Sequence, residues 1–272
     1  AANSRRRPVA RSAPSRQETY DRSITTFDPN GRLLQVEYGM QAASRGSPIL
    51  CALLDDCLYI ATYTHGSVRH DDTSSSSMQQ QQQVHRLDDH IFLFATGLVG
   101  DSLFLAAQMR AYCQNHRLEH GEAPTVRQVA TEAANFQHKL TRTGGYRPLG
   151  CTAILAGVDP FFDDDQGEKS SSVNLARHLH LFRSGPGGVL EDCLYCAAGK
   201  QQDHLMKRLQ SDLYSSPKEL AKSEIMNRMA AIFDGLVGGG EKDDRNACHV
   251  WTIEPSSVRR GKMKACCHMN VH

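Results

Sequence analysis

The sequence predicts an α+β fold in which two β-sheets lie between two layers of helices. Apolar runs of strand length and longer amphipathic segments occur in blocks, in the order strands, two helices, strands, two helices, strand. Strict alternation of strands and helices would indicate a parallel sheet, so the block order favours sheets with helices on their outer faces. The 272 residues, 40% of them hydrophobic, can fill such a core as one large domain.

The first block begins with a helix over residues 33–45. Its apolar positions follow a near-helical spacing: Leu33, Val36, Met40 and Ala43. Gly46 is expected to end it. Residues 49–54 and 57–62 are short apolar runs on either side of two aspartates, which predicts two antiparallel strands joined by a tight turn.

The middle block contains a strand at residues 91–96 and two helices. We expect the first helix to be capped by Asp101 and to end near Cys113. The second begins at a capping box of Thr125 and Gln128. Its inner face carries Val126, Val129, Ala130, Ala133, Phe136 and Leu140, which reads as core and not as a cofactor site.

The third block contains a buried strand at residues 151–158 and a hairpin. The hairpin pairs residues 178–183 with 189–195 around a glycine-rich turn. The last long helix is expected to begin at Ser216, with Pro217 in its first turn and Glu219 completing a capping box. A final strand spans 247–253.

Composition excludes several classes of partner. The 31 Lys and Arg nearly balance the 30 Asp and Glu, so no global field attracts nucleic acid or an anionic membrane surface. No apolar run is long enough to span a bilayer. Nine cysteines without a repeating spacing suit reduced thiols in the cytosol or nucleus better than a disulfide framework.

Domain organisation follows from low-complexity segments. Residues 1–19 are rich in Arg, Ser and Ala, without an acid before Glu18, and are expected to be a disordered basic tail; a transit peptide or nuclear address is the alternative. Residues 20–272 form the single domain. It is interrupted by a Ser/Gln insertion at 73–83 and an acidic loop at 163–168, both expected to be solvated.

Three segments carry a resemblance to the proteasome alpha-type subunits. The longest runs from Tyr20 to Tyr38 and reads YDRSITTFDPNGRLLQVEY. The second is Leu87-Asp88-Asp89-His90-Ile91 running into TGLVGD at 96–101, and the third is GGYRPLG at 144–150 followed by a strand ending in GVD at 157–159. The match thins out over the C-terminal third.

This resemblance implies a four-layer αββα sandwich, the N-terminal nucleophile hydrolase fold, in the outer heteroheptameric ring of the 20S core. The implied partners are other alpha subunits, the beta ring and a regulatory ATPase particle or other activator, in the cytoplasm and nucleus, for ATP- and ubiquitin-dependent degradation. The residues implied for axial gating are Tyr20, Asp21, Arg22, Pro29 and Tyr38. The helix bearing Leu33, Val36 and Met40 would contact neighbouring ring subunits. Gln83 occupies the position where the family often has a lysine that receives activator tails.

Catalysis in the related beta family needs a threonine at a free N-terminus, with a lysine and an acid nearby. The matching segment here is Gly46-Ser47-Pro48 with a long extension before it, and the first lysine in the sequence is Lys139. The position of the acid, counted from Ser47, falls near Tyr63 and Thr64. We therefore predict no catalytic residue, although a serine hydrolase starting at Ser47 stays open as an alternative.

Three clusters resemble metal or acid sites, and we assign none of them. Cys266-Cys267-His268 with Cys248-His249 lacks the paired spacing of a zinc site. Asp88-Asp89 is better explained by a turn and cap, and 163–165 lacks the spacing of a calcium loop. No cofactor is expected.

Departures from the family keep another function open. Gly39 stands where the family usually has alanine, and the hairpin tip Gly185-Pro186-Gly187-Gly188 replaces an Asp-Pro-Ser-Gly type turn. With the Ser/Gln insertion, these departures are also compatible with a diverged pseudo-subunit that acts as an assembly or interaction module.

Overall fold

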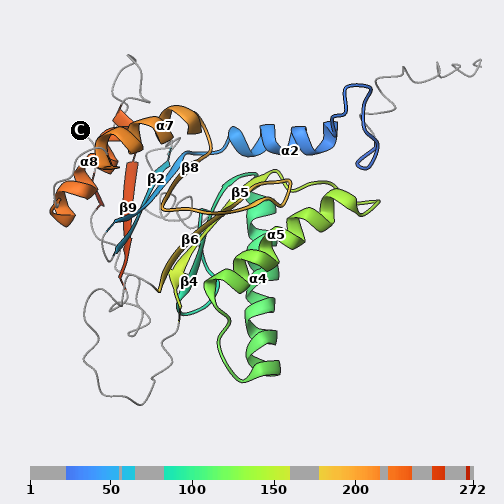
Figure 1. The fold of residues 1–272 in the computed structure, drawn as a ribbon, viewed down its shortest axis with the longest axis horizontal. Coiled ribbons are helices and arrows are strands. Elements are labelled where there is room, and N and C mark those ends of the chain that lie inside the picture. The colour runs from blue at the N-terminus through green and yellow to red at the C-terminus, as the bar shows by residue number, and fades with distance from the viewer. Residues whose placement is uncertain are drawn as a thin grey trace, which may run out of the picture.

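Two antiparallel sheets of five strands each form the centre of the fold (Figure 1). The computed structural model describes residues 23–54, 57–64, 83–159, 178–214, 220–234, 247–254 and 268–269. The first sheet has the order β10-β9-β2-β1-β8 and the second the order β3-β4-β5-β6-β7. In the first sheet the strands are β1 (Ile49–Leu54), β2 (Cys57–Thr64), β8 (Tyr195–Ala198), β9 (Ala247–Ile253) and β10 (His268–Met269). In the second they are β3 (Val84–Arg86), β4 (Ile91–Gly97), β5 (Cys151–Val158), β6 (Leu179–Ser184) and β7 (Leu190–Asp192).

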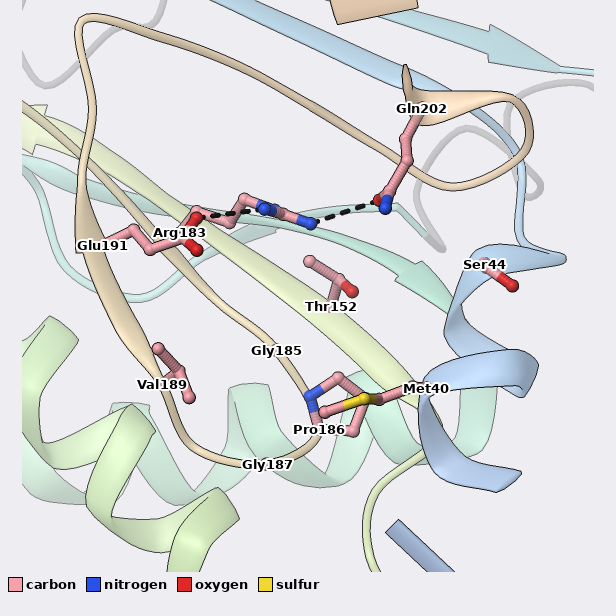
Figure 2. Close-up of a pocket in the computed structure, with 10 residues that line it drawn as sticks. All are labelled: Met40, Ser44, Thr152, Arg183, Gly185, Pro186, Gly187, Val189, Glu191 and Gln202. Carbon is pink, nitrogen blue, oxygen red and sulfur yellow. Dashed lines mark hydrogen bonds and ion pairs between the residues drawn. The ribbon is translucent and has the colours of Figure 1, made fainter. Parts of the chain in front are cut away.

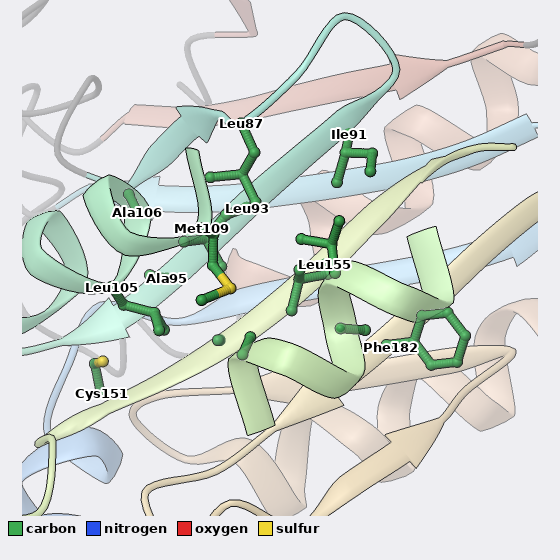
Figure 3. Close-up of a cluster of buried hydrophobic side chains, with 14 of the residues drawn as sticks. Leu87, Ile91, Leu93, Ala95, Leu105, Ala106, Met109, Cys151, Leu155 and Phe182 are labelled. Carbon is green, nitrogen blue, oxygen red and sulfur yellow. The ribbon is translucent and has the colours of Figure 1, made fainter. Parts of the chain in front are cut away.

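Helices α4 (Val99–His120) and α5 (Val126–Arg142) cover the outer face of the second sheet. Figure 3 shows Leu105, Ala106 and Met109 of α4 meeting Leu93 and Leu155 of the sheet. The apolar stripe of α5 predicted from its spacing is buried here, apart from the partly buried Phe136. The capping box at its start is confirmed, since the Thr125 hydroxyl accepts from the Gln128 N–H and the Gln128 side chain accepts from the Thr125 N–H.

The first sheet is covered by α7 (Gln202–Leu209), by the π-helical turn η1 (Gln210–Tyr214) that continues it, and by α8 (Lys222–Asp234). A third apolar cluster fills the space between the two sheets, with Phe94, Ile60 and Ile154 among its buried members. The predicted sandwich of helices, two sheets and helices is therefore confirmed.

Two expectations for α4 are wrong. The helix does not end near Cys113 but continues to His120, where Gly121 adopts a left-handed conformation and stops it. Asp101 does not cap the helix either, because Leu98 is the capping residue and makes no side-chain cap bond. The Asp101 carboxylate is buried and accepts from Arg147 through two bonds of 2.7 Å and from the Gly150 N–H at 2.7 Å.

The expected hairpin is confirmed only for its first part, the pairing of β6 with β7. β7 pairs with β6, but it ends at Asp192, and after Cys193 the chain crosses to the other sheet as β8. The expected second strand therefore splits between two sheets. The last long helix starts at Lys222. The expected capping residues Ser216, Pro217 and Glu219 lie outside the described residues, as do the acidic loop 163–168 and residues 73–82 of the insertion.

Helix α2 (Leu34–Ser44) lies at one end of the sandwich, beside the ends of β5 and β8 (Figure 1). It packs on β4 and β5. Among the described residues, no helix is both long and apolar enough to cross a bilayer.

Candidate functional site around helix α2

The segment before α2 is a turn built on Asp28. Its carboxylate accepts hydrogen bonds from the N–H groups of Asn30 (2.9 Å) and Arg32 (2.8 Å), and its own N–H donates to the Arg32 carbonyl (2.9 Å). Gly31 adopts φ +77°, which glycine tolerates without strain. The DPNGR sequence therefore closes on itself and leaves Pro29 exposed at the tip of the turn.

An ion pair joins this turn to the helix. The Arg32 Nε donates to the Glu37 carboxylate at 2.7 Å, and a second guanidinium nitrogen contacts the other carboxylate oxygen. This hydrogen bonding lowers the pKa of Glu37 and raises that of Arg32. The capping position, Leu33, has no side-chain acceptor, so Glu37 in the first turn is the acid that faces the positive end of the helix dipole.

The inner face of α2 approaches its neighbours unusually closely at Gly39, which is buried. A Cβ atom placed on Gly39 would stand 3.3 Å from the Leu149 carbonyl oxygen and 3.4 Å from the Cβ atoms of Pro148 and Pro186. The structure brings Gly39 close to the turn that contains Pro186.

A pocket of about 270 Å³ opens where α2 meets the β6–β7 hairpin (Figure 2). Met40, Pro186 and Val189 form its apolar end. The hairpin tip approaches α2 closely here, since a Cβ atom on Gly187 would stand in van der Waals contact at 3.4 Å from the Met40 Cε and 3.8 Å from Val36 Cγ1. The full lining consists of Met40, Ser44, Thr152, Arg183, Gly185, Pro186, Gly187, Val189, Glu191 and Gln202.

Arg183 spans the polar end of this pocket. Figure 2 shows its guanidinium between two partners: one nitrogen donates to the Glu191 carboxylate at 3.0 Å and another to the Gln202 side-chain oxygen at 3.1 Å. The charges of Arg183 and Glu191 cancel each other. The pocket therefore offers a half-apolar slot with no net charge, and no acid–base pair aimed at a reaction centre.

The chain leaving α2 is locked at the position expected for a nucleophile. The Thr96 hydroxyl donates to the Ser47 carbonyl at 2.6 Å, and the Lys200 N–H donates to the Gly46 carbonyl at 2.9 Å. A Cβ atom on Gly46 would overlap Gly97 and Thr96, and one on Gly199 would stand 2.6 Å from the Ser47 oxygen. Backbone from three segments, residues 46–47, 96–97 and 199–200, converges here and leaves Ser47 inside a continuous chain.

The structure places one lysine, Lys200, and the position expected for the acid, Tyr63, near Ser47. The sequence offers no lysine in the N-terminal strands, yet the fold brings Lys200 beside Gly46. Its contact is made by the backbone, and its side chain is exposed. Tyr63 lies in β2 with its side chain buried against Phe233, as a core residue.

The sequence-predicted interface residues of α2 fall on different faces. Tyr38 and Met40 are each 47% exposed, whereas Leu33 and Val36 are half-buried. Val36 and Met40 lie beside Gly187 of the same chain. The predicted apolar stripe of α2 is therefore partly packed against the hairpin and partly exposed to solvent. Tyr20, Asp21 and Arg22 lie outside the described residues.

Gln83 directly precedes edge strand β3 and lies beside β4, one of the two strands on which α2 packs. Its carbonyl accepts from the Ala95 N–H at 2.9 Å, which continues the ladder by one residue. Arg86 is three residues on and therefore on the opposite face of the strand. It pairs with Asp89 and donates to the Asp88 carbonyl, so its positive charge is already paired with a carboxylate.

The clusters left unassigned have structural partners. Asp88 and Asp89 lie in the turn between β3 and β4, and Asp88 is paired with Arg117 at 2.7 Å. Burial opposes ionisation of Asp88, but the bonds from Arg117 and from the Asp89 N–H hold its pKa below the usual range. β10 pairs with β9 and places His268 opposite His249. Within the described residues, no three His, Cys, Asp or Glu side chains are grouped to hold a metal ion.

Sequence reasoning missed the pocket and its polar frame. Arg183, Glu191 and Gln202 come from a strand, its hairpin partner and a helix that begins after the crossover, so no local spacing links them. The signal that was available is the glycine-rich hairpin tip at 185–188.

Comparison with known proteins agrees with the resemblance. Residues 20–42 match the N-terminal signature of proteasome A subunits, and residues 43–165 match the proteasome subunit family. The chain is 28% identical over 242 residues to proteasome subunit alpha type-7-B of Arabidopsis thaliana, covering 89% of this chain and 86% of that protein. It is 31% identical over 193 residues to proteasome subunit alpha type-4 of Saccharomyces cerevisiae, covering 64% of this chain and 74% of that protein. It is also 31% identical over 193 residues to proteasome subunit alpha of Methanococcus maripaludis, covering 71% of this chain and 66% of that protein.

The two matched regions adjoin and together extend from the turn before α2 to the end of β5, through the strands and helices that carry the sandwich. The alpha-specific signature covers the Asp28 turn and most of α2. The chain belongs to the proteasome alpha-type subunit family.

Proposed function

We propose that the chain is a non-catalytic subunit of the outer ring of a 20S proteasome core, acting in ATP- and ubiquitin-dependent protein degradation. The observation that supports this best is the locked connection at Gly46 and Ser47. An N-terminal nucleophile must have a free amine as its base and open space for substrate. Here Ser47 follows a helix, and its carbonyl is held by Thr96 at 2.6 Å.

Helix α2 is the proposed contact to neighbouring alpha subunits in a heteroheptameric ring that stacks on a beta ring. Tyr38 and Met40 lie on different sides of this helix, and each is 47% exposed. Large side chains left half-exposed on one helix favour a protein partner. Such a subunit would work where standard cores work, in the cytoplasm and nucleus.

The Asp28 turn is the proposed base of an axial gate. It is closed by its own hydrogen bonds and leaves Pro29 exposed at its tip. The gate itself would be formed by Tyr20-Asp21-Arg22 and the basic tail 1–19, which precede this turn in the sequence. Deletion of residues 1–19 should raise basal peptide hydrolysis by the assembled core. Unchanged hydrolysis by particles that contain the deletion would refute gating by this tail.

Docking of a regulatory ATPase particle is proposed to be weak at this subunit. Gln83 supplies no charge for a carboxylate, and charge-assisted hydrogen bonds are roughly twice as strong as neutral ones. Arg86 cannot replace the missing charge because it is paired with Asp89 on the opposite face of the strand.

A diverged pseudo-subunit in the same domain, residues 20–272, is the second candidate. The contact between Gly39 and the Pro186 turn favours it, because two departures from the family meet there beside a pocket. A ring interface remodelled at this pocket would suit a partner other than the usual neighbour.

Native mass spectrometry of the tagged full-length chain from its own cells separates these functions. A standard ring subunit should be recovered in particles with six other alpha-type subunits and beta subunits. Recovery only in a smaller complex would favour the pseudo-subunit. Catalysis is tested on the purified chain alone, which should not hydrolyse fluorogenic peptides. Turnover that disappears in Ser47→Ala would overturn the non-catalytic assignment.

A further inference from the structure

The last turns of α4 carry two histidines at a spacing of four residues. His116 and His120 begin and end the sequence HRLEH. Side chains four residues apart project from the same side of a helix, one turn above the other. The centres of the two imidazole rings are 4.4 Å apart, and the ring planes make an angle of 54°. The two rings are therefore neighbours on one face of the helix.

One hydrogen bond fixes the position of the proton on His116. Gly121 ends α4 in a left-handed conformation with φ 76°, and beyond this turn the Glu122 carbonyl oxygen lies 3.2 Å from the His116 Nδ1. A carbonyl oxygen can only accept, so Nδ1 carries a proton and donates it. In the neutral ring the lone pair is then on Nε2, which makes no hydrogen bond to the described residues. Metal-binding histidines have this arrangement, with the other ring nitrogen donating to a carbonyl or carboxylate.

His120 can supply a second nitrogen. It is the exposed last residue of α4, and its ring nitrogens make no hydrogen bond within the described part of the chain, so the ring can turn. Two imidazoles bound to one ion at about 2.1 Å, with an angle of about 90–110° between the bonds, place their ring centres about 4.6–5.3 Å apart. The observed separation of 4.4 Å is close to this range. A small rotation of His120 is therefore enough to aim both rings at one point.

The electrostatic surroundings favour a cation at this point. The last turn of α4 is the negative end of the helix dipole. Glu119, which directly precedes His120, adds a carboxylate to the same turn. The positive charge of Arg117 is paired with Asp88 at 2.7 Å. The nearest cation in the sequence is thus neutralised, and it does not repel a metal ion.

We propose that His116 and His120 bind one divalent transition-metal ion of the class that prefers imidazole ligands, which includes Ni²⁺, Cu²⁺ and Zn²⁺. The His116 Nε2 and one ring nitrogen of His120 are the two protein ligands. Within the described residues no third His, Cys, Asp or Glu side chain joins them, so water completes the coordination sphere. The ion joins two successive turns of α4 and stabilises the end of the helix, because it binds only the folded pair.

This site is separate from the proposed ring contact. Figure 1 shows that α4 runs away from α2 toward the loop that precedes α5, and the two histidines lie in that distal half of α4. Metal binding and ring assembly therefore use different parts of the molecule, and failure of one proposal leaves the other standing.

The test uses the full chain and Ni²⁺, since thiolates select Zn²⁺ and Cu⁺ more strongly. Each histidine is modified with diethyl pyrocarbonate, and the products are assigned by peptide mapping. We expect the reactivity of His120 to be lost as Ni²⁺ saturates the site and to return when a chelator is added. His204, an exposed histidine of α7, is the control and should react equally with and without Ni²⁺. Unchanged reactivity of His120 at saturating Ni²⁺ would overturn the proposal.

Two variants distinguish a pair of ligands from a single one. In His116→Gln, His120 should stay reactive at the Ni²⁺ concentration that protects it in the parent chain. The double variant Leu118→His, His120→Gln keeps His116 and the number of histidines, and it changes only exposed positions. Its two imidazoles are two residues apart and do not face each other, so the ring introduced at position 118 should stay reactive.

Protection that persists in His116→Gln, or equal protection of the ring introduced at position 118, would show that one exposed histidine is sufficient and would overturn the pair. The double variant decides the question if His116→Gln fails to fold, because it leaves the buried His116 in place.

Discussion

Gly39 of α2 and Pro186 of the hairpin turn are in such close contact that a methyl group on Gly39 would stand 3.4 Å from the Pro186 Cβ. Gly46, one residue past the helix cap, is more confined, because the same methyl group there would overlap the backbone of Gly97. We therefore expect a methyl group to be tolerated better at Gly39 than at Gly46. The contacts of Gly39 are at 3.3–3.4 Å and can relax by a few tenths of an ångström, whereas a methyl group on Gly46 would overlap the backbone at the end of β4.

For Gly39→Ala we expect a change in unfolding free energy within about 1 kcal/mol. Alanine gains roughly 1 kcal/mol in helix propensity, which offsets the tight contacts with Leu149 and Pro186. Gly46→Ala should cost at least about 3 kcal/mol, since backbone must move. Urea unfolding of both variants measures this difference. Equal stability of the two would show that the approach at Gly46 is not a real constraint.

Met40→Asp should exclude the subunit from the ring. Met40 is half-exposed at the pocket between α2 and the hairpin. An aspartate buried there by a neighbour would have no positive partner among the residues that line the pocket except Arg183, which Glu191 already neutralises. Co-purification with tagged beta subunits reads out incorporation. The matched control is Gln114→Asp, on an exposed position of α4.

Full recovery of Met40→Asp in assembled particles would remove α2 from the ring interface. Exclusion of Gln114→Asp to the same extent would show that any added charge, and not its position on α2, prevents assembly.

Gln83→Lys should strengthen docking of activator tails at this subunit. The lysine adds a charge-assisted hydrogen bond to a terminal carboxylate, with a gain of about 1 kcal/mol, or roughly fivefold in affinity. Crosslinking of a tail peptide to assembled cores measures it, and the gain should shrink at high salt. Arg86→Gln serves as the control and should leave crosslinking unchanged because Arg86 is engaged by Asp89. A crosslink that does not increase in Gln83→Lys contradicts the proposed pocket.

Asp101 should make stability depend on acid pH. Burial opposes its ionisation, but the bonds from Arg147 and Gly150 lower its pKa below the ordinary value. Its contribution is therefore complete above the unfolded pKa of about 3.9 and is lost as pH falls through the lower folded pKa. Asp101→Asn should cost about 2 kcal/mol at neutral pH and flatten this acid dependence.

The control for Asp101 is Asp89→Asn. Asp89 also accepts from an arginine, but its side chain is 71% exposed and the pair is solvated, so the change should stay below about 1 kcal/mol. Thermal unfolding between about pH 3 and pH 7 compares the two variants. Parallel pH curves for wild type and Asp101→Asn would mean that the Arg147 pair does not contribute to folding.

The parts of the fold that depend on local pattern could be predicted from the sequence. The capping box at Thr125 and the buried strand β5 are set by residues close to each other, and both are confirmed. The switch of sheets at Cys193 could not be predicted, because alternation of apolar residues does not show which sheet a strand joins. Asp101 was misassigned for a similar reason, since its true partner Arg147 is 46 residues away.

The candidate site was predicted only in part. The signature motif locates α2 and its turn, but the burial of Gly39 depends on Pro148 and Pro186, which come from two other loops. The pocket beside Met40 forms where the hairpin tip at Gly187 meets α2, and the sequence does not show that these two segments come together.

The meeting point of Gly46, Thr96 and Gly199 bears on whether such a chain could acquire catalysis. Removing the residues before Ser47 would expose an amine, but it would also delete the helix that packs on β4 and β5. The Ser47 carbonyl would still be held by Thr96, and any side chain on Gly199 would meet it. A hydrolase would therefore require several coordinated changes at once, so the proposed lack of catalysis would follow from the architecture and not from one missing residue.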